Sequence, residues 1–119
     1  MEKPLQIVMR HLEPSLALEA RIREHIARLE TVHPHIVGCR VAVEALRRHD
    51  RQGHAFQVRI DARVPGKEYV ATRKHDSDVM LALHEAYHAL RRQLEDDIRL
   101  KRGEVKQHAP RRAPEENGA

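Results

Sequence analysis

The strongest constraint on the fold lies in the extended segment of residues 54–64, where apolar and polar residues alternate from Phe56 onward. Every second residue from Phe56 to Ala62 is apolar, and the residues between them are polar or charged. A two-residue period is typical of a β-strand with one buried and one solvated face. Pro65-Gly66 follows, which favours a tight turn, and residues 67–74 form a second extended segment. The sequence therefore predicts a β-hairpin with one wet face.

Two further strands and two helices are predicted around this hairpin. Residues 4–12 and 36–46 are extended segments with alternating apolar residues. Apolar residues at helical spacing predict a first helix over residues 15–31, capped by Ser15, and a second helix that ends near Arg102-Gly103. Candidate N-caps of the second helix are Asp76, Ser77 and Asp78.

The order of the elements is β-α-β-β-β-α. Two amphipathic helices need an apolar surface, and a sheet with one wet face offers that surface on its other side. We therefore predict an α+β fold, a two-layer sandwich in which a four-stranded, largely antiparallel sheet carries both helices on one face. A chain of 119 residues has room for one core. We expect one domain over residues 1–103 and a flexible tail over residues 104–119, a segment with two prolines and few apolar residues.

Several classes of function are disfavoured by composition. The single cysteine, Cys39, lies in an alternating apolar run, so we expect a buried structural thiol and not a nucleophile. The aromatic residues Phe56, Tyr69 and Tyr87 are too few to form a set of base-stacking rings. No apolar run approaches the roughly 20 residues that cross a bilayer, and the first residues lack the layout of a signal peptide. We therefore expect a cytoplasmic protein that does not contact membranes.

The segment H-E-A-Y-H, which begins at His84, matches the H-E-x-x-H pattern of zinc hydrolases. On a helix, His84 and His88 would project from one face as two zinc ligands, and Glu85 would serve as general base. A catalytic zinc needs a third protein ligand, and the extended pattern asks for glycine and histidine where this chain has Arg91 and Leu94. We therefore expect no metal, no cofactor, no small-molecule substrate and no enzymatic activity, and a small zinc hydrolase is the most remote alternative.

Positive charge is concentrated on the two predicted helices. The chain has 22 Lys and Arg against 18 Asp and Glu, a net charge of +4. At about 3.6 residues per turn, the second helix carries a stripe of cations, and the first carries cations beside its apolar stripe. A basic surface poor in aromatic rings suits the phosphate backbone of a structured RNA. The candidate RNA-binding residues are Arg21, His25, Arg28, Arg91, Arg92, Arg99, Lys101, Arg102 and Lys106.

Three consecutive acids, Glu95 to Asp97, interrupt the basic stripe of the second helix. Ion pairs on an exposed helix stabilise it only weakly and lower its positive potential. Two interpretations therefore stay open from charge alone, an RNA-binding surface and a helix whose charges are simply solvated. The expected ion pairs are Glu95 with Arg99, Asp97 with Lys101, Arg91 with Glu95, and Arg92 with Asp96.

Five short stretches, taken in order, carry a resemblance to a known family. They are A-R-L-E (27–30), V-A-V-E (41–44), D-V-M-L-A-L (78–83), R-R-Q-L (91–94) and V-K-Q-H (105–108). Together with the order of elements, they resemble the ribosome hibernation factors, which comprise hibernation-promoting factor and ribosome-associated inhibitor A and are also called the sigma-54 modulation family. The resemblance covers about residues 4–108 and is to the short form, which lacks an extra C-terminal domain.

The resemblance implies a translation regulator of the stress response. It implies binding to the small ribosomal subunit in the decoding region, overlapping the mRNA and tRNA sites, with basic side chains of both helices facing ribosomal RNA. Arg28 and Arg92 match basic positions of the family, and His25 stands at a place where a family member carries lysine. Ala89 stands where lysine is common, and Glu95–Asp97 replaces a neutral or basic stretch.

The alternative from another class is a protein-interaction module of the same fold that has lost ribosome binding, with its acids and tail serving a protein partner. In either case we expect a monomer, with a homodimer through an exposed edge strand as the alternative state.

Overall fold

The computed structural model describes residues 1–47 and 54–107, apart from the side chains of residues 47, 54 and 101–107. It confirms the predicted order β-α-β-β-β-α. The elements are β1 (Gln6–Arg10), α1 (Leu16–Val32), β2 (Gly38–Arg47), β3 (His54–Val64), β4 (Lys67–Asp76) and α2 (Val79–Gln107). Within the described part of the chain, no helix is long and apolar enough to span a membrane.

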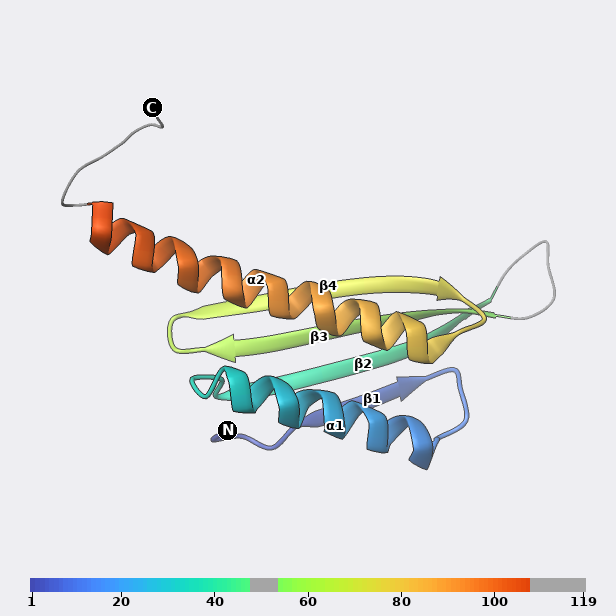
Figure 1. Cartoon of the computed structure of the whole chain (residues 1–119). Helices are drawn as coiled ribbons and strands as arrows, with labels where there is room; N and C mark the ends of the chain where they lie inside the picture. Colours follow the sequence, from blue (N-terminus) through green and yellow to red (C-terminus); the bar gives the residue numbers. More distant parts are fainter. Residues whose placement is uncertain (48–53, 108–119) are drawn as a thin grey trace.

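The four strands form one sheet in the order β1-β2-β3-β4. β1 pairs with β2 in parallel, with Ile7 opposite Val41, while β2, β3 and β4 form an antiparallel meander. The sheet is therefore largely antiparallel, as predicted. The parallel pair is joined through α1, and both helices lie on the same face of the sheet (Figure 1). The predicted two-layer α+β sandwich is confirmed.

Local signals in the sequence set the boundaries of most elements. The Ser15 side chain caps α1, because its hydroxyl oxygen accepts a hydrogen bond from the Leu18 N–H at 3.1 Å. Of the three candidate caps for α2, Asp78 accepts a hydrogen bond from the Leu81 N–H at 3.0 Å. Gly66 has a φ of 80°, the left-handed conformation that favours glycine in the tight turn between β3 and β4.

The end of α2 differs from the prediction. The helix does not stop at Arg102-Gly103 but continues to Gln107. A glycine inside a helix costs only about 1 kcal/mol relative to alanine, and the residues on both sides of Gly103 are good helix formers. Residues 48–53 of the predicted polar connection and residues 108–119 of the predicted tail lie outside the described residues, so the flexibility of the tail stays a prediction.

The core lies between the sheet and the two helices. Val58, Ile60 and Ala62 of β3 are completely buried, which confirms the alternation in this strand. Leu18, Ile22, Ile26 and Leu29 of α1 and Ala82, Leu83, Ala86 and Leu90 of α2 cover them. Cys39 is also buried, as expected, and burial raises the pKa of its thiol to about 12.

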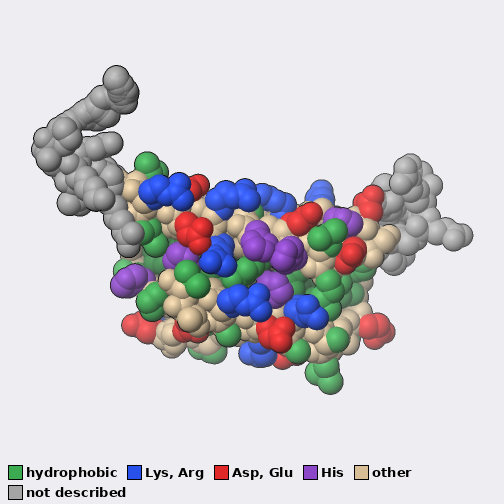
Figure 2. Space-filling view, viewed as in Figure 1, with side chains coloured by type: hydrophobic (Ala, Val, Ile, Leu, Met, Phe, Trp, Pro, Cys, Tyr) green, Lys and Arg blue, Asp and Glu red, His purple; other side chains and the backbone are tan. Residues whose placement is uncertain are grey.

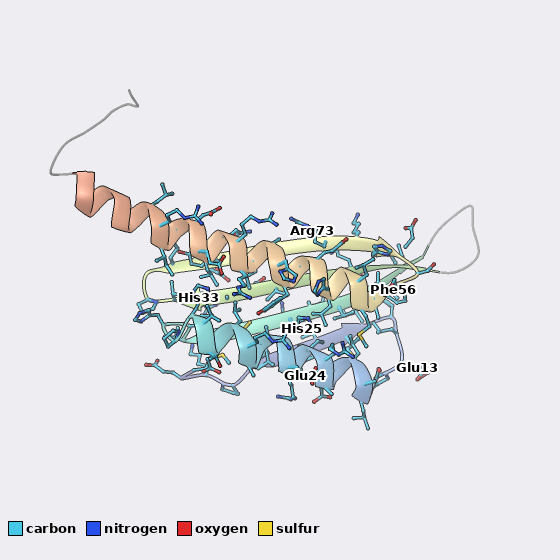
Figure 3. The ribbon with its side chains drawn as sticks, in the orientation of Figure 1. Glu13, Glu24, His25, His33, Phe56 and Arg73 are labelled. Atoms are coloured by element: carbon cyan, nitrogen blue, oxygen red, sulfur yellow. The ribbon has the colours of Figure 1, made fainter. Side chains whose placement is uncertain are left out.

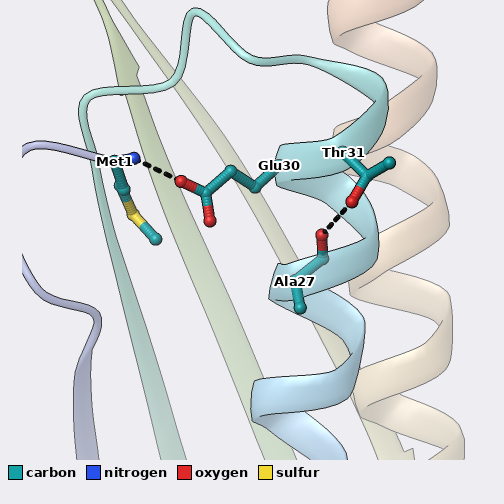
Figure 4. A network of polar contacts seen from close by, with 4 residues as sticks. All are labelled: Met1, Ala27, Glu30 and Thr31. Atoms are coloured by element: carbon teal, nitrogen blue, oxygen red, sulfur yellow. Dashed lines mark hydrogen bonds and ion pairs between the residues drawn. The ribbon is translucent and has the colours of Figure 1, made fainter.

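The last turns of α1 carry polar contacts on both sides of the helix (Figure 4). The Met1 ammonium group forms an ion pair with Glu30. The Thr31 hydroxyl donates to the Ala27 carbonyl oxygen at 3.0 Å, which satisfies this side chain within the helix. The Met1–Glu30 ion pair thereby connects the segment before β1 to the end of α1.

Candidate nucleic-acid interface

The outer surface of the two helices carries a cluster of arginines. We call this surface the helical face and define it by Arg21 and Arg28 of α1 and Arg91, Arg92 and Arg99 of α2. All of them are exposed except Arg91, which is half-buried. Figure 2 shows Lys, Arg and His side chains gathered on this face of the molecule, with acids between them. The structure therefore brings these five predicted arginines onto one surface.

Arg28 and Arg92 differ from the other arginines of this face. Arg21 lies 3.5 Å from Glu24, Arg91 lies 2.8 Å from Glu95, and Arg99 lies 3.6 Å from Asp96. Among the described side chains, neither Arg28 nor Arg92 forms an ion pair. Their guanidinium groups are exposed and can bind an anion without first leaving a carboxylate.

His25 takes a different position from its predicted neighbours. Only 6% of it is exposed, and its ring packs edge-on against Tyr87, with ring centroids 4.9 Å apart. The side chain lies in the space between the helices (Figure 3), and its Nδ1 is 2.8 Å from the Arg21 carbonyl oxygen. Burial is the main cause that lowers the pKa of His25, helped by Arg28 and Arg21. His25 therefore supports the helical face from beneath and does not protrude from it.

Each of the three consecutive acids has a partner within the protein. The pair of Arg91 with Glu95 forms as predicted, but Arg99 lies beside Asp96 and not Glu95. Asp97 turns away from the basic stripe and accepts hydrogen bonds from Lys67 Nζ at 3.1 Å and from the Tyr69 hydroxyl. Asp97 therefore joins α2 to β4, while its predicted pair with Lys101 stays a prediction, because the Lys101 side chain lies outside the described residues.

The last three predicted contacts, Lys101, Arg102 and Lys106, belong to α2, but their side chains lie outside the described residues. The predicted pair of Arg92 with Asp96 does not form among the described side chains. The sequence patterns also missed Arg73 of β4. Arg73 lies two residues from Ala71 and four from Tyr69, which are buried beneath the helices. Because every second side chain of a strand points to the same face, Arg73 points toward the helix side of the sheet.

Arg73 reaches the surface because it lies on the edge strand β4, on the side of α2 away from α1 (Figure 3). There it meets α2 at a shallow hollow whose lining is rich in nitrogen donors. The hollow is lined by Arg73, His84, Glu85, His88, Ala89 and Arg92. The two-residue period of β4 is enough to predict which face of the sheet Arg73 lies on. It does not predict which residues of α2 lie beside Arg73.

The residues of the H-E-x-x-H match form part of this hollow. His84 and His88 lie with ring centroids 4.3 Å apart, and His25 lies 6.1 Å from His84. Within the described part of the chain, no three His, Cys, Asp or Glu side chains are arranged to hold a metal ion. Leu94, at the place of the third histidine of the extended pattern, is buried in the core. The motif thus supplies two neighbouring imidazoles without a third ligand.

The uncovered face of the sheet has a more balanced charge. A shallow depression at the Gly38 end is lined by the cations Lys3, Arg40 and Arg63 and by the acids Asp61 and Glu68. Asp61 accepts a hydrogen bond from Arg59 at 2.9 Å. The lining thus holds three cations and two acids, and one of these acids is engaged by Arg59.

Comparisons with known proteins agree with the fold. A family model described as Sigma 54 modulation protein / S30EA ribosomal protein matches residues 5–99. A ribosomal subunit interface protein from Coxiella burnetii is similar in structure, with a TM-score of 0.65 and 17% identity over 77% of this chain and 93% of that chain. The N-terminal domain of Protein Y from Thermus thermophilus has a TM-score of 0.59 and 19% identity over 76% of this chain and 93% of that chain. A search of curated proteins finds no match.

Proposed function

Because the chain belongs to the Sigma 54 modulation protein / S30EA ribosomal protein family, we propose that it is a ribosome-binding hibernation factor whose helical face contacts ribosomal RNA. It binds the small subunit near the decoding region and blocks the mRNA and tRNA sites without catalysing a reaction. It acts in the cytoplasm, as a monomer. The Coxiella burnetii protein of similar fold is described as a ribosomal subunit interface protein, which supports a ribosomal partner.

The main support for this proposal is the exposure of Arg28 and Arg92 and their lack of an ion pair among the described side chains. Both arginines are exposed, come from different helices, and form no ion pair among the described side chains. Exposed guanidinium groups bind phosphate oxygens with bidentate geometry, and binding is favoured by release of counterions from the RNA. They are also the two arginines at basic positions of the family that this sequence resembles. We therefore assign Arg28 and Arg92 as the primary phosphate contacts.

The paired arginines have a secondary role in this proposal. Arg91 and Arg99 must exchange Glu95 and Asp96 for phosphate oxygens when RNA binds. Ion pairs at a solvent-exposed surface are weak, so the exchange is feasible but reduces the gain from each contact. The remaining contacts of the proposal are Arg21, Lys101, Arg102 and Lys106.

Co-sedimentation with purified small subunits and whole ribosomes over a series of salt concentrations tests the proposal. We expect saturable binding that weakens steeply with salt, and a double variant Arg28→Glu, Arg92→Glu that binds much more weakly. The variant Lys3→Glu, Lys74→Glu is the charge-matched control, because both lysines are exposed and lie outside the helical face. Equal loss of binding in both variants would mean that net charge, and not the helical face, determines affinity.

The position on the ribosome needs a separate test. Chemical probing of ribosomal RNA with and without the bound protein should show protection in the decoding region, and added mRNA and tRNA should displace the protein. Protection only elsewhere on the small subunit would refute the proposed blockage.

The alternative is an interaction module that uses its acids to bind a protein partner. Glu95 is engaged by Arg91, Asp96 by Arg99, and Asp97 by β4. A protein partner would have to displace these contacts, just as RNA would have to displace those of Arg91 and Arg99. A pull-down of one protein that is insensitive to salt, together with no ribosome binding, would nevertheless favour that alternative.

A further inference from the structure

The hollow between α2 and β4 has the composition of an anion site. Arg73 and Arg92 bring two guanidinium groups to it, His84 and His88 bring two imidazoles, and Glu85 is the one carboxylate in its lining. The remaining lining residue, Ala89, has only a methyl group, and it is 8% exposed. A small side chain at this place leaves room for a group the size of phosphate between the longer side chains.

The two imidazoles could in principle bind a transition metal, since they lie at i and i+4 on one helix. The charges around them argue against a cation. Arg73 and Arg92 line the same hollow, and Arg91 and Arg92 act on His88 as neighbouring positive charges. These fixed charges repel a divalent cation and attract an anion. The surroundings therefore select an anion as the ligand.

We propose that this hollow binds a backbone phosphate of RNA, with Arg73 and Arg92 as permanent donors and His84 and His88 as donors that act fully when protonated. The inference rests on the proposed function and adds Arg73, His84 and His88 to its contacts. A protonated imidazole donates charge-assisted hydrogen bonds, which are stronger than those of the neutral ring. RNA binding is therefore coupled to proton uptake.

The direction of this coupling follows from the charges that face the imidazoles. Burial is the main cause that lowers the pKa of His88, and His84, Arg91, His25 and Arg92 add to the effect. In the free protein His88 is therefore mainly neutral at pH 7. From α1, the positive charges of Arg28 and Arg21 help to lower the pKa of His25, whose ring lies 6.1 Å from that of His84. Among the described residues, the carboxylate of Glu85 on α2 and the guanidinium of Arg73 on β4 also line the hollow.

A bound phosphate offsets the repulsion between these positive groups and favours the protonated ring. RNA affinity then rises as pH falls. The rise covers the pH range in which an imidazole is protonated in the complex but neutral in the free protein. The affinity stops rising at the pH at which the same imidazole is protonated in the free protein too. A rise of one unit in the pKa of one ring on binding corresponds to about tenfold in affinity.

The test measures the affinity for small ribosomal subunits between about pH 8 and pH 5.5, the range over which histidine changes its charge, at constant ionic strength. We expect the wild type to bind about tenfold more tightly at the acidic end, and the variant His84→Gln, His88→Gln to lose that gain. The matched control is His11→Asn, His35→Gln, which removes two exposed histidines elsewhere. Asparagine is chosen because His11 has a φ of 62°, a conformation that asparagine adopts readily.

The variants separate this inference from the proposed function. Arg73→Gln should weaken binding at every pH and leave the pH dependence intact. An equal pH dependence in the wild type and in the His84→Gln, His88→Gln variant would overturn the subsite while leaving ribosome binding in place. No binding by the wild type at any pH or salt concentration would refute the proposed function instead.

A measurement without the ribosome tests the subsite in either case. Inorganic phosphate, added to the isolated protein at low salt, should shift the NMR signals of the His84 and His88 rings in a saturable manner. The pH midpoint of the His88 ring should rise. No shift would overturn the subsite, and so would stoichiometric zinc in protein purified without a polyhistidine tag, because it would show that the ligand is a cation.

Discussion

Asp97 and Asp96 are neighbours in the same acidic segment, yet the structure predicts very different effects when each is replaced by alanine. Asp97 accepts a hydrogen bond from the hydroxyl of Tyr69, whose side chain is buried, and another from Lys67. Asp96 faces Arg99 at 3.6 Å, and both side chains are largely exposed. Asp97→Ala should therefore destabilise the protein, and Asp96→Ala should not.

The magnitude follows from the hydrogen bond between Asp97 and Tyr69, which the substitution removes. A hydrogen bond to a charged group contributes about 1.5–3 kcal/mol. Asp97 keeps 17% of its side chain exposed, so water replaces part of this bond in the variant. We expect Asp97→Ala to reduce the free energy of unfolding by about 2 kcal/mol, without counting the exposed Lys67. This corresponds to a fall in Tm of about 8 °C for a domain of this size. Asp96→Ala should change the free energy by less than about 0.5 kcal/mol.

Urea denaturation of Asp97→Ala, Tyr69→Phe and the double variant measures the coupling between the two side chains. We expect a coupling free energy of about 1–2 kcal/mol, because each single variant already breaks the same hydrogen bond. If the two changes were additive, or if Asp96→Ala cost as much as Asp97→Ala, Asp97 would not be the residue that fastens α2 to β4.

Three further predictions concern separate parts of the molecule. The Arg28→Glu, Arg92→Glu variant should lower the slope of log affinity against log salt by about 1 for each phosphate that is no longer neutralised, measured by ribosome co-sedimentation. The Cys39 thiol should react with iodoacetamide at pH 8 only after unfolding, because its pKa is raised to about 12 and the thiolate is the reactive form; rapid labelling of the native protein would contradict its burial. Gly66→Ala should destabilise the protein by about 1 kcal/mol in thermal unfolding, because a φ of 80° strains alanine. Its control is Gly38→Ala, which should be tolerated, because the added methyl group meets only Lys3, whose Cβ is 3.7 Å away.

The sequence is most informative where structure depends on local rules. Alternation predicts β3 over residues 54–64, which are its observed bounds, and Pro65-Gly66 predicts the turn that follows. Ser15 identifies the start of α1. The predicted end of α2 is wrong because Gly103 is a weak stop signal, since a single glycine inside a helix costs only about 1 kcal/mol.

Helical periodicity predicts only part of the candidate site. Periodicity identifies Arg28, Arg91 and Arg92 as surface cations, and the structure brings them onto one face. The burial of His25 beneath the face depends on Tyr87 of the other helix, and the partners of Asp97 depend on where α2 crosses β4. Such contacts depend on the alignment of distant elements, for which a single sequence carries no signal.

The parallel pairing of β1 with β2 has a consequence for the order in which the chain folds. β2, β3 and β4 pair with their immediate neighbours along the chain, whereas β1 must wait for α1 to cross the sheet. β1 spans only Gln6–Arg10, and none of its residues is fully buried. Contacts between distant segments form late, and short, partly exposed strands open most easily. Amide hydrogens of residues 7–9 should therefore exchange with solvent before those of residues 58–62, so β1 would be the last strand to join the sheet and the first to leave it.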